Sequence, residues 1–298
     1  MFKYHLVAFM VVAIWGTTFV STKLLLLNGL SPAHIFTLRF IIAYVMLLGA
    51  SCFLPRHRWM SKNWKDELIM LGLGVTGGSL YFMTENAAMN YTTTTNTSLI
   101  VCLCPLFASL LISICYKSER LHGLQIVGSL LAAIGVTIVV LNGRFVLHLS
   151  PIGDALAFAA CLCWALYSLL LIPASKHYDT LFITRKVFAY GLLSMLPYYA
   201  IYPEMPPMEA LLRYDTILQL LFLGCIASTI CFLVWNWVIR RLGAIVTTNY
   251  VYFNPVVTIL CAWMVLNERI TGWFLLGTVM ILAGMYLADK KQKTSNNA

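Results

Sequence analysis

Three ionisable side chains fall inside otherwise apolar stretches in the first third of the chain. Glu85 is the only acidic residue well inside such a stretch, and Lys23 and Arg39 are basic residues inside two others. If the stretches are helices, the three side chains lie at depths that agree within roughly 5 Å, at 1.5 Å of rise per residue. A carboxyl group so placed can pair with a cation or exchange a proton. We therefore predict such a role for Glu85, the alternative being that all three side chains reach water.

Aromatic and amide side chains are the candidate walls of a binding cavity. Trp15 and Trp164 each fall near the middle of an apolar stretch, where a large aromatic ring can line a cavity or simply pack. Amides inside such stretches can act in a site or hydrogen-bond a neighbouring helix. The full set of candidate site residues is Trp15, Tyr81, Glu85, Asn86, Asn96, Trp164, Trp235, Asn236, Asn249 and Tyr252.

The elements that must position these residues are ten apolar stretches. The chain has 298 residues, of which 60% are hydrophobic and 10% charged, well below the roughly 25% charged residues of soluble domains. A bilayer-spanning helix needs roughly 20 mostly apolar residues. We therefore predict an all-α integral membrane protein with ten transmembrane helices. The stretches are residues 4–26, 33–54, 68–88, 97–115, 124–141, 155–172, 182–202, 217–239, 244–266 and 273–288.

The basic residues predict how these helices are oriented. If the N-terminus is cytoplasmic, fifteen of the 20 Lys and Arg residues fall in cytoplasmic segments and three in outer loops. This split follows the positive-inside rule. We therefore predict a multi-pass protein of the cell (inner) membrane with both termini in the cytoplasm and the lipid bilayer as its main contact.

An internal repeat divides the chain into residues 4–141 and 153–288. A shift of 149 or 150 residues aligns ten identical pairs, among them Trp15 with Trp164 and Pro105 with Pro255. Because each part holds five predicted helices, an odd number, the second part must enter the membrane in the opposite orientation. Inverted repeats of this kind place a substrate site between the two halves, near the midplane of the bilayer.

Small residues and prolines also recur in both parts. Gly128 and Gly135, like Gly277 and Gly284, are spaced to let two helices approach closely. Pro105 and Pro255 each remove a backbone hydrogen bond inside a span. We predict helix packing for the glycines and a bend for each proline, either structural or functional.

Several of these motifs together resemble a known family. The segment Trp15-Gly16-Thr17-Thr18-Phe19 with Lys23, the pair Arg39-Phe40 after Pro32, and Asn96-Thr97-Ser98-Leu99-Ile100 before Pro105 are similar to EamA-type members of the drug/metabolite transporter superfamily. So are Glu119-Arg120 and Glu268-Arg269, each followed by glycines. The resemblance implies a ten-helix inner-membrane carrier, often an exporter of amino acids, other metabolites or toxic compounds. It implies a small-molecule substrate that moves by alternating access, without naming it.

Other classes of protein fit the sequence less well. No HExxH, GxSxG or metal-ligand spacing occurs, so we expect no enzymatic activity and no cofactor. No basic stripe suggests nucleic-acid binding, and the nine cysteines form no CxxC pair. A membrane channel or a receptor-like protein without catalytic activity remains the alternative to a carrier. The oligomeric state does not follow from the sequence.

Overall fold

The computed structural model describes residues 2–53, 59–92, 94–116, 123–141, 150–266 and 271–290. These residues form helices and connecting turns with no strand among them, which confirms the all-α prediction. In chain order the helices are α1 (Phe2–Leu27), α2 (Pro32–Phe53), α3 (Trp64–Gly74), the π-helix η1 (Val75–Ser79), α4 (Leu80–Tyr91), α5 (Thr94–Val101), α6 (Cys104–Cys115), α7 (Gly123–Leu141), α8 (Pro151–His177), α9 (Thr180–Leu193), α10 (Leu196–Ile201), α11 (Met208–Leu211), α12 (Tyr214–Leu221), the π-helix η3 (Phe222–Ile230), α13 (Cys231–Leu242), α14 (Ala244–Asn249), the 3-10 helix η4 (Tyr250–Phe253), α15 (Asn254–Leu266) and α16 (Gly272–Lys290).

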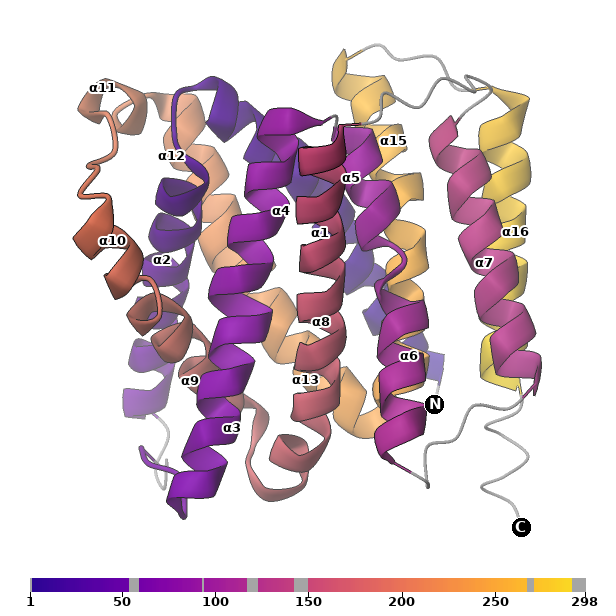
Figure 1. Ribbon diagram of the computed structural model, residues 1–298, viewed down its shortest axis with the longest axis horizontal. Coiled ribbons are helices and arrows are strands. Elements are labelled where there is room, and N and C mark those ends of the chain that lie inside the picture. The colour runs from indigo at the N-terminus through magenta and orange to yellow at the C-terminus, as the bar shows by residue number, and fades with distance from the viewer. Residues whose placement is uncertain are drawn as a thin grey trace.

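The helices run side by side as one bundle (Figure 1). In the described part of the chain, seven helical segments are long and apolar enough to cross a membrane, and the shorter apolar helices 123–139 and 272–288 accompany them. The start of α1 and the end of α16 both lie toward the lower end in Figure 1. Large apolar side chains such as Val45, Leu130 and Leu275 are exposed on the outside of the bundle, as expected where lipid replaces water.

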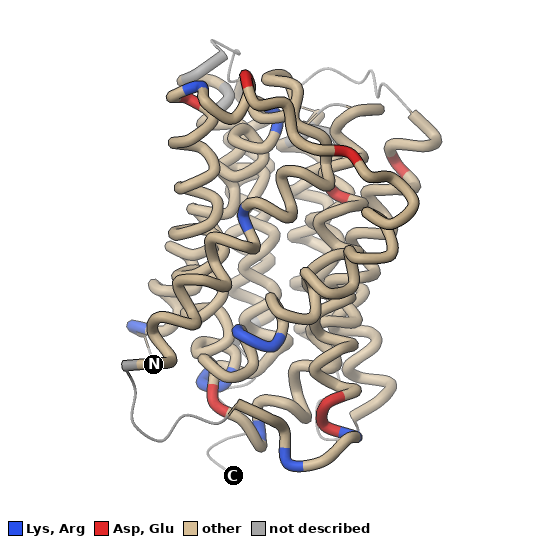
Figure 2. Tube along the Cα trace, turned by 90° about the vertical axis from the view of Figure 1, so that its left-hand side faces the viewer, with Lys and Arg blue, Asp and Glu red and all other residues tan. Residues whose placement is uncertain are grey.

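Charged residues gather at the two ends of the bundle. Figure 2 shows a nearly uncharged belt between these ends, and more Lys and Arg at the lower end, where α1 begins. A belt with few charges is what a bilayer core requires, because burying an unpaired charge there is costly.

Several of the predicted stretches are not single uninterrupted α-helices. Residues 182–202 form α9 and α10, separated at Ser194 and Met195. Pro197 lies in the first turn of α10 and cannot donate a backbone hydrogen bond to the preceding turn, which explains the break. Residues 97–115 are likewise divided before Pro105, between α5 and α6. Residues 68–88 contain the π-helix η1, and the matching region of the second part contains η3.

Two helices pack tightly through the predicted glycines. A Cβ atom added to Gly128 would lie 2.5 Å from the carbonyl oxygen of Gly284, and one added to Gly135 would lie 2.8 Å from that of Gly277. The packing is reciprocal, since a Cβ atom on Gly284 would meet the Gly128 oxygen at 2.5 Å. The prediction of close helix packing is confirmed, and α7 and α16 form a pair at one edge of the bundle (Figure 1).

Polar side chains and one glycine set the ends of several helices. Asn63 accepts a hydrogen bond from the Asp66 amide at the start of α3, and Asp179 accepts one from the Phe182 amide at the start of α9. These N-caps satisfy backbone donors that a helix leaves free. Gly243 has a φ of 86°, which suits glycine, and it turns the chain between α13 and α14.

The central helices are α1 and α8. Helix α1 packs against α13 and α15, and α8 packs against α4 and α6. In the internal repeat, α13 corresponds to α4 and α15 corresponds to α6. Helices α1 and α8 therefore have corresponding neighbours, each from the other part of the chain. This arrangement brings Trp15 on α1 and Trp164 on α8 to the middle of the bundle.

Candidate binding pocket

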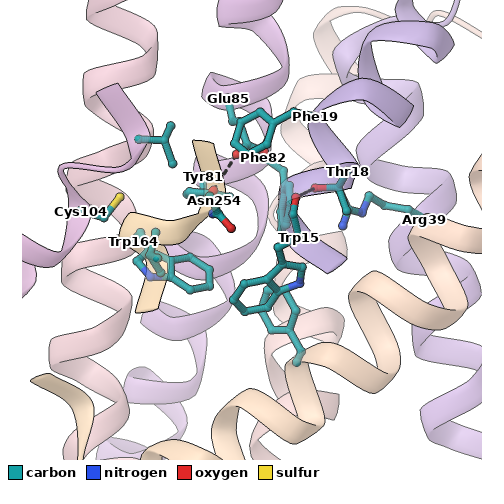
Figure 3. Close-up of a pocket in the computed structure, with 13 residues that line it drawn as sticks. Trp15, Thr18, Phe19, Arg39, Tyr81, Phe82, Glu85, Cys104, Trp164 and Asn254 are labelled. Carbon is teal, nitrogen blue, oxygen red and sulfur yellow. Dashed lines mark hydrogen bonds between the residues drawn. The ribbon is translucent and has the colours of Figure 1, made fainter. Parts of the chain in front are cut away.

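A pocket lies in the middle of the bundle, between helices of both parts of the chain (Figure 3). Its free space for the centre of a water-sized molecule is about 30 Å³, which is room for about two waters. A metabolite therefore needs the surrounding helices to separate before it fits. The lining residues are Trp15, Thr18, Phe19, Arg39, Tyr81, Phe82, Glu85, Val101, Cys104, Trp164, Phe232, Val251 and Asn254.

Aromatic rings form most of the wall. The rings of Trp15 and Trp164 meet edge to face, with centroids 5.5 Å apart and planes at 88°. Phe232 lies 5.5 Å from Trp15, and Tyr81 lies 5.1 Å from Trp164. Such contacts favour a defined ring geometry. The Trp15 indole also donates a hydrogen bond of 3.0 Å from Nε1 to the carbonyl of Ala227, which fixes that ring.

The pocket carries one carboxyl group and one guanidinium group. The Tyr81 hydroxyl donates a 2.6 Å hydrogen bond to Glu85 Oε1, and both side chains belong to α4. Arg39 is 2% exposed, its Nε donates a 2.9 Å hydrogen bond to Ser228 Oγ, and its guanidinium carbon lies 4.3 Å from the centre of the Phe82 ring. Figure 3 shows Arg39 entering from the side opposite Trp164 and Cys104.

Glu85 does not form an ion pair with either of the two described cations predicted as its partners, Lys23 and Arg39. Lys23 Nζ donates a 2.8 Å hydrogen bond to the Met89 carbonyl, so this cation is held near the end of α4 and does not line the pocket. Arg39 and Glu85 share the pocket, but these two described side chains do not form an ion pair, whose atoms would lie within 4.0 Å. The two opposite charges therefore face one space without touching.

Two polar atoms at the pocket have no hydrogen-bond partner. They are Nε1 of Trp164, a donor, and Oδ1 of Asn254, an acceptor. Both residues are 5% exposed and both line the pocket. Buried polar atoms are nearly always hydrogen-bonded, so an unpaired donor and an unpaired acceptor in one cavity favour a polar ligand or ordered water between them.

The two prolines shape the pocket, as their predicted bends suggested. Val101 and Cys104 precede Pro105 in the first part, and Val251 and Asn254 precede Pro255 in the second, and all four line the cavity. Proline deprives the residue four positions earlier of its usual partner. The Val251 carbonyl instead accepts hydrogen bonds from the Asn254 amide and from the Cys102 thiol at 3.4 Å.

The structure brings together only some of the predicted site residues. Trp15, Tyr81, Glu85 and Trp164 line the pocket. Trp235 lies behind the wall, fully buried, with its ring 4.9 Å from that of Trp15.

The predicted amides lie outside the pocket lining. Asn236 accepts a 2.9 Å hydrogen bond from the Tyr167 hydroxyl and donates one of 3.0 Å to Thr184, so it ties helices together. Asn86 donates to the Pro32 carbonyl at 3.4 Å. Asn249 and Tyr252 are buried away from the cavity. The side chain of Asn96 lies outside the described part of the structure.

Several lining residues escaped the sequence reasoning. Asn254 carried one usable signal, since it directly precedes Pro255, where the helix has to break. Arg39 was predicted only as a possible partner of Glu85 and not as a residue of the pocket wall, although it is a basic residue two turns into an apolar stretch. Thr18, Phe19, Phe82 and Phe232 carried no signal that separates a cavity wall from ordinary packing.

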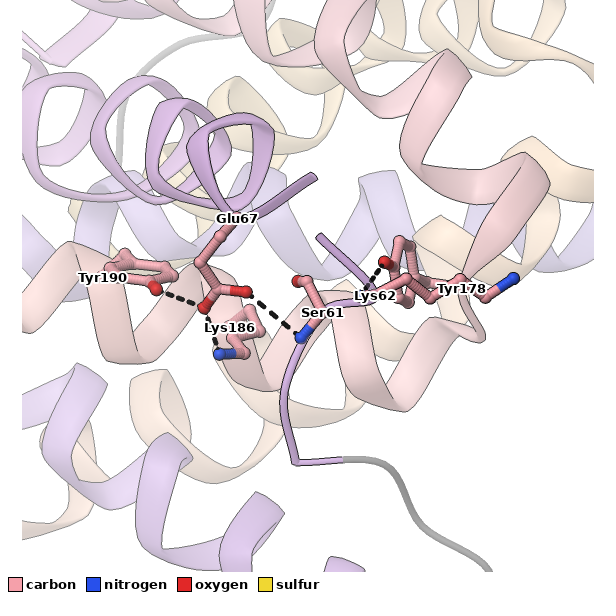
Figure 4. A network of polar contacts seen from close by, with 6 residues as sticks. All are labelled: Ser61, Lys62, Glu67, Tyr178, Lys186 and Tyr190. Atoms are coloured by element: carbon pink, nitrogen blue, oxygen red, sulfur yellow. Dashed lines mark hydrogen bonds and ion pairs between the residues drawn. The ribbon is translucent and has the colours of Figure 1, made fainter. Parts of the chain in front are cut away.

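A second polar cluster lies where α3 begins, toward the lower end of the bundle in Figure 1, and Figure 4 shows it from close by. Glu67 on α3 accepts hydrogen bonds from Lys186 Nζ and from the Tyr190 hydroxyl, both on α9. Nearby, the Tyr178 hydroxyl donates a 2.6 Å hydrogen bond to Asp66. Burial and this bond raise the pKa of Tyr178, so its hydroxyl keeps the proton that it donates. The cluster joins helices from the two parts of the chain.

Histidine, cysteine and acidic side chains do not gather into a metal site among the residues that the structure describes. The free cysteines there include Cys102, Cys104 and Cys161, which are buried. Such thiols behave as small apolar side chains.

An all-helical bundle with a nearly uncharged belt defines a multi-pass membrane protein, and the pocket lies at the centre of that bundle. The sequence matches the EamA-like transporter family over residues 2–141 and again over residues 151–288. The chain belongs to this family, and the resemblance seen in its motifs is confirmed.

Relatives of similar length are named as transporters. An "Uncharacterized transporter" of Archaeoglobus fulgidus is 26% identical over 97% of this chain and 98% of its own length. A "Probable amino-acid metabolite efflux pump" of Escherichia coli K12 is 26% identical over 96% of this chain and 94% of its own. A solved crystal structure with 20% identity superposes with a TM-score of 0.74, covering 96% of this chain and 98% of that one, and so shows the same fold.

Proposed function

We propose that this protein is a carrier that exports a small metabolite, an amino acid or a drug-like compound by alternating access. The observation that carries the proposal is the central pocket. It is lined by residues from both parts of the chain, with aromatic walls, one carboxyl group and one guanidinium group. Ligand sites in membrane carriers lie between repeats in this way.

The repeat itself is part of the proposal. Ten spans would form two inverted halves of five, residues 4–141 and 153–288. The family match to two successive regions supports this division. The corresponding neighbours of α1 and α8, the paired π-helices and the two proline breaks support it as well.

The orientation that we propose places both termini in the cytoplasm of the cell (inner) membrane. Supporting this, the basic end of the bundle is the end where α1 starts and α16 finishes, and positive loops stay inside. In this orientation Glu85 and Phe19 lie on the outer side of the pocket, and Trp235 and Tyr167 lie on its cytoplasmic side.

Closure toward the cytoplasm has a physical basis in this arrangement. Below the pocket, Trp235 is fully buried and packs on Trp15 and Trp164, and the Tyr167–Asn236 hydrogen bond lies beneath these rings. We infer that these contacts close the cytoplasmic path in the state described here. The Glu67 cluster would hold the same end shut, and transport would require both sets of contacts to loosen.

The names of two relatives bear on the substrate class. The Escherichia coli relative is named for amino-acid metabolites, and a relative in Streptantibioticus cattleyicolor, 25% identical over 94% of this chain, is named a "Probable terminal-alkyne amino-acid exporter". These names favour amino-acid-like solutes as the first to test. A channel or a receptor-like protein is the alternative.

The test is uptake of radiolabelled candidates into proteoliposomes that contain the purified protein. Uptake should saturate with substrate concentration, and a pH gradient should change its rate if transport is coupled to protons. Uptake that rises linearly with concentration would favour a channel. A receptor-like protein would bind solute without moving any across the bilayer.

A further inference from the structure

We propose that Arg39 and Glu85 recognise the two opposite charges of a zwitterionic head group, with the ligand's carboxylate at Arg39 and its ammonium at Glu85. The proposal rests on the proposed carrier function and names the chemistry of its substrate. It starts from the fact that the two side chains face one pocket without forming an ion pair.

Arg39 is a buried cation whose charge is poorly compensated. Its Nε bonds the neutral Ser228 hydroxyl and its guanidinium lies over the Phe82 ring. Among the residues that the structure describes, no carboxylate lies within ion-pair distance of it. Burying a charge without a partner is energetically costly. A guanidinium group held in this way at a cavity wall is well suited to accept the planar, bidentate contact of a carboxylate.

Glu85 presents the complementary group to the same pocket. One of its oxygens, Oε1, is occupied by the Tyr81 hydroxyl, and the residue is 7% exposed. Lys23, the other cation of this region, is engaged by the Met89 carbonyl. An ammonium group in the pocket would therefore meet a carboxylate that no described lysine or arginine already pairs.

The unpaired atoms of the pocket suit the same head group. Asn254 Oδ1 can accept a hydrogen bond from an ammonium, and Trp164 Nε1 can donate one to a carboxylate. The aromatic walls around Trp15 and Phe232 then remain for an apolar side chain.

Charge selection excludes the simpler ligands. A purely cationic ligand would pair with Glu85 but would be repelled by Arg39. A purely anionic ligand would pair with Arg39 but would be repelled by Glu85. Only a ligand with both charges compensates both groups, so the pocket discriminates by repulsion as well as attraction.

The test measures binding to the full-length protein in lipid nanodiscs by calorimetry. The probes are leucine, phenylalanine and tryptophan, each as the free zwitterion, as the cationic amide and as the anionic N-acetyl derivative. We expect at least one zwitterion to bind about tenfold or more tightly than both of its singly charged derivatives, since each lost charge contact is worth about 1.4 kcal/mol or more.

Two variants should invert this preference in opposite directions. Arg39→Gln should reduce zwitterion binding about tenfold and tighten binding of the amide, because the repulsion is gone. Glu85→Gln should instead tighten binding of the N-acetyl derivative. Arg39→Lys should retain part of the preference because it keeps the charge. Lys23→Gln is the matched control, since Lys23 is a nearby cation outside the pocket lining, and it should leave the preference unchanged.

The proposal is overturned if no zwitterion binds more tightly than its derivatives, or if Lys23→Gln shifts the preference as much as Arg39→Gln does. The outcome is separable from the carrier function. Saturable transport of non-zwitterionic solutes would refute the head-group assignment and leave the carrier intact. Selective zwitterion binding without transport would support the head-group assignment and refute the carrier function.

Discussion

Trp15 and Trp164 meet edge to face at the centre of the molecule, 149 positions apart in the sequence, with their ring centroids 5.5 Å apart. One ring comes from each of the two central helices. Both rings line the pocket, and their contact joins the two parts of the chain there.

The first prediction separates a pocket wall from ordinary packing. Trp164→Phe should cost less than about 1.5 kcal/mol in stability, because an aromatic ring is retained beside existing free space, but should reduce transport about tenfold or more by removing the indole donor. Trp235→Ala is the contrasting variant, since Trp235 is fully buried behind the wall. Its truncation should cost about 3–5 kcal/mol. Detergent-titrated unfolding and transport rates measure the two effects, and equal destabilisation by both variants would make Trp164 a packing residue.

The second prediction concerns external pH. The groups that face Glu85 are Tyr81, Arg39 and the thiols of Cys102 and Cys104. Protonation of Glu85 from the outside would remove the contact to the substrate ammonium, so wild-type transport should fall as external pH falls. Glu85→Gln should give a slower rate that is flat with pH.

Transport by Glu85→Gln at the wild-type rate, with the wild-type pH profile, would remove Glu85 from substrate binding and from coupling. A normal level of the variant in the membrane is the required control. The side chain would then be one that merely reaches water near the end of its helix.

The third prediction concerns the Glu67 cluster. Glu67→Gln should destabilise the protein by about 1–3 kcal/mol, because it leaves the buried Lys186 without its carboxylate. It should also speed the opening of the cytoplasmic side, measured as faster labelling of a cysteine placed at Ser168 beneath the pocket. Asp215→Asn breaks an exposed ion pair with Arg213 and is the control, with no measurable loss of stability expected. Equal effects of the two substitutions would argue against a latch at Glu67.

The fourth prediction concerns the glycine contacts of α7 and α16. Gly284→Ala should destabilise the protein by about 1–3 kcal/mol, because the added methyl group would meet the Gly128 carbonyl oxygen at 2.5 Å. Gly49→Ala on α2 meets no atom within 4 Å and should be neutral or stabilise by up to about 1 kcal/mol. Unfolding measurements on both variants compare the effects, and a neutral Gly284→Ala would mean that the helices pack less closely.

The fifth prediction concerns orientation. Reporter fusions after Ser150 and after Lys290 should differ, with a phosphatase that is active only outside the cytoplasm working at the first site and silent at the second. The reverse pattern would contradict the cytoplasmic termini. Activity at both sites would show an even number of spans between them, which would contradict the inverted repeat.

The sequence predicted those parts of the site that stand out from their surroundings. Trp15 and Trp164 were found because matching residues recur 149 positions apart, and Glu85 because an acid is rare inside a span. Helical fold and glycine packing followed from composition and spacing, which depend on local physics.

The remaining parts depend on contacts between distant segments. Asn236 and Asn254 are both amides inside apolar stretches, yet one is consumed by Tyr167 and Thr184 and the other keeps a free oxygen at the pocket. The packing of α8, α9 and α13 determines that Asn236, and not Asn254, has its side chain fully engaged in hydrogen bonds. Likewise, Phe82 and Phe232 each lie just after a π-helix, η1 or η3, and only the packing of the helices places them at the pocket.

The most direct test of the central claim is counterflow in proteoliposomes, with leucine or the best zwitterion from the binding series as the labelled solute. An alternating-access carrier with its site in this pocket should take up label faster when the vesicles already contain unlabelled solute, because the loaded site returns more readily, and Arg39→Gln should abolish the stimulation. Uptake that neither saturates nor responds to internal solute, or full stimulation in Arg39→Gln, would contradict the account.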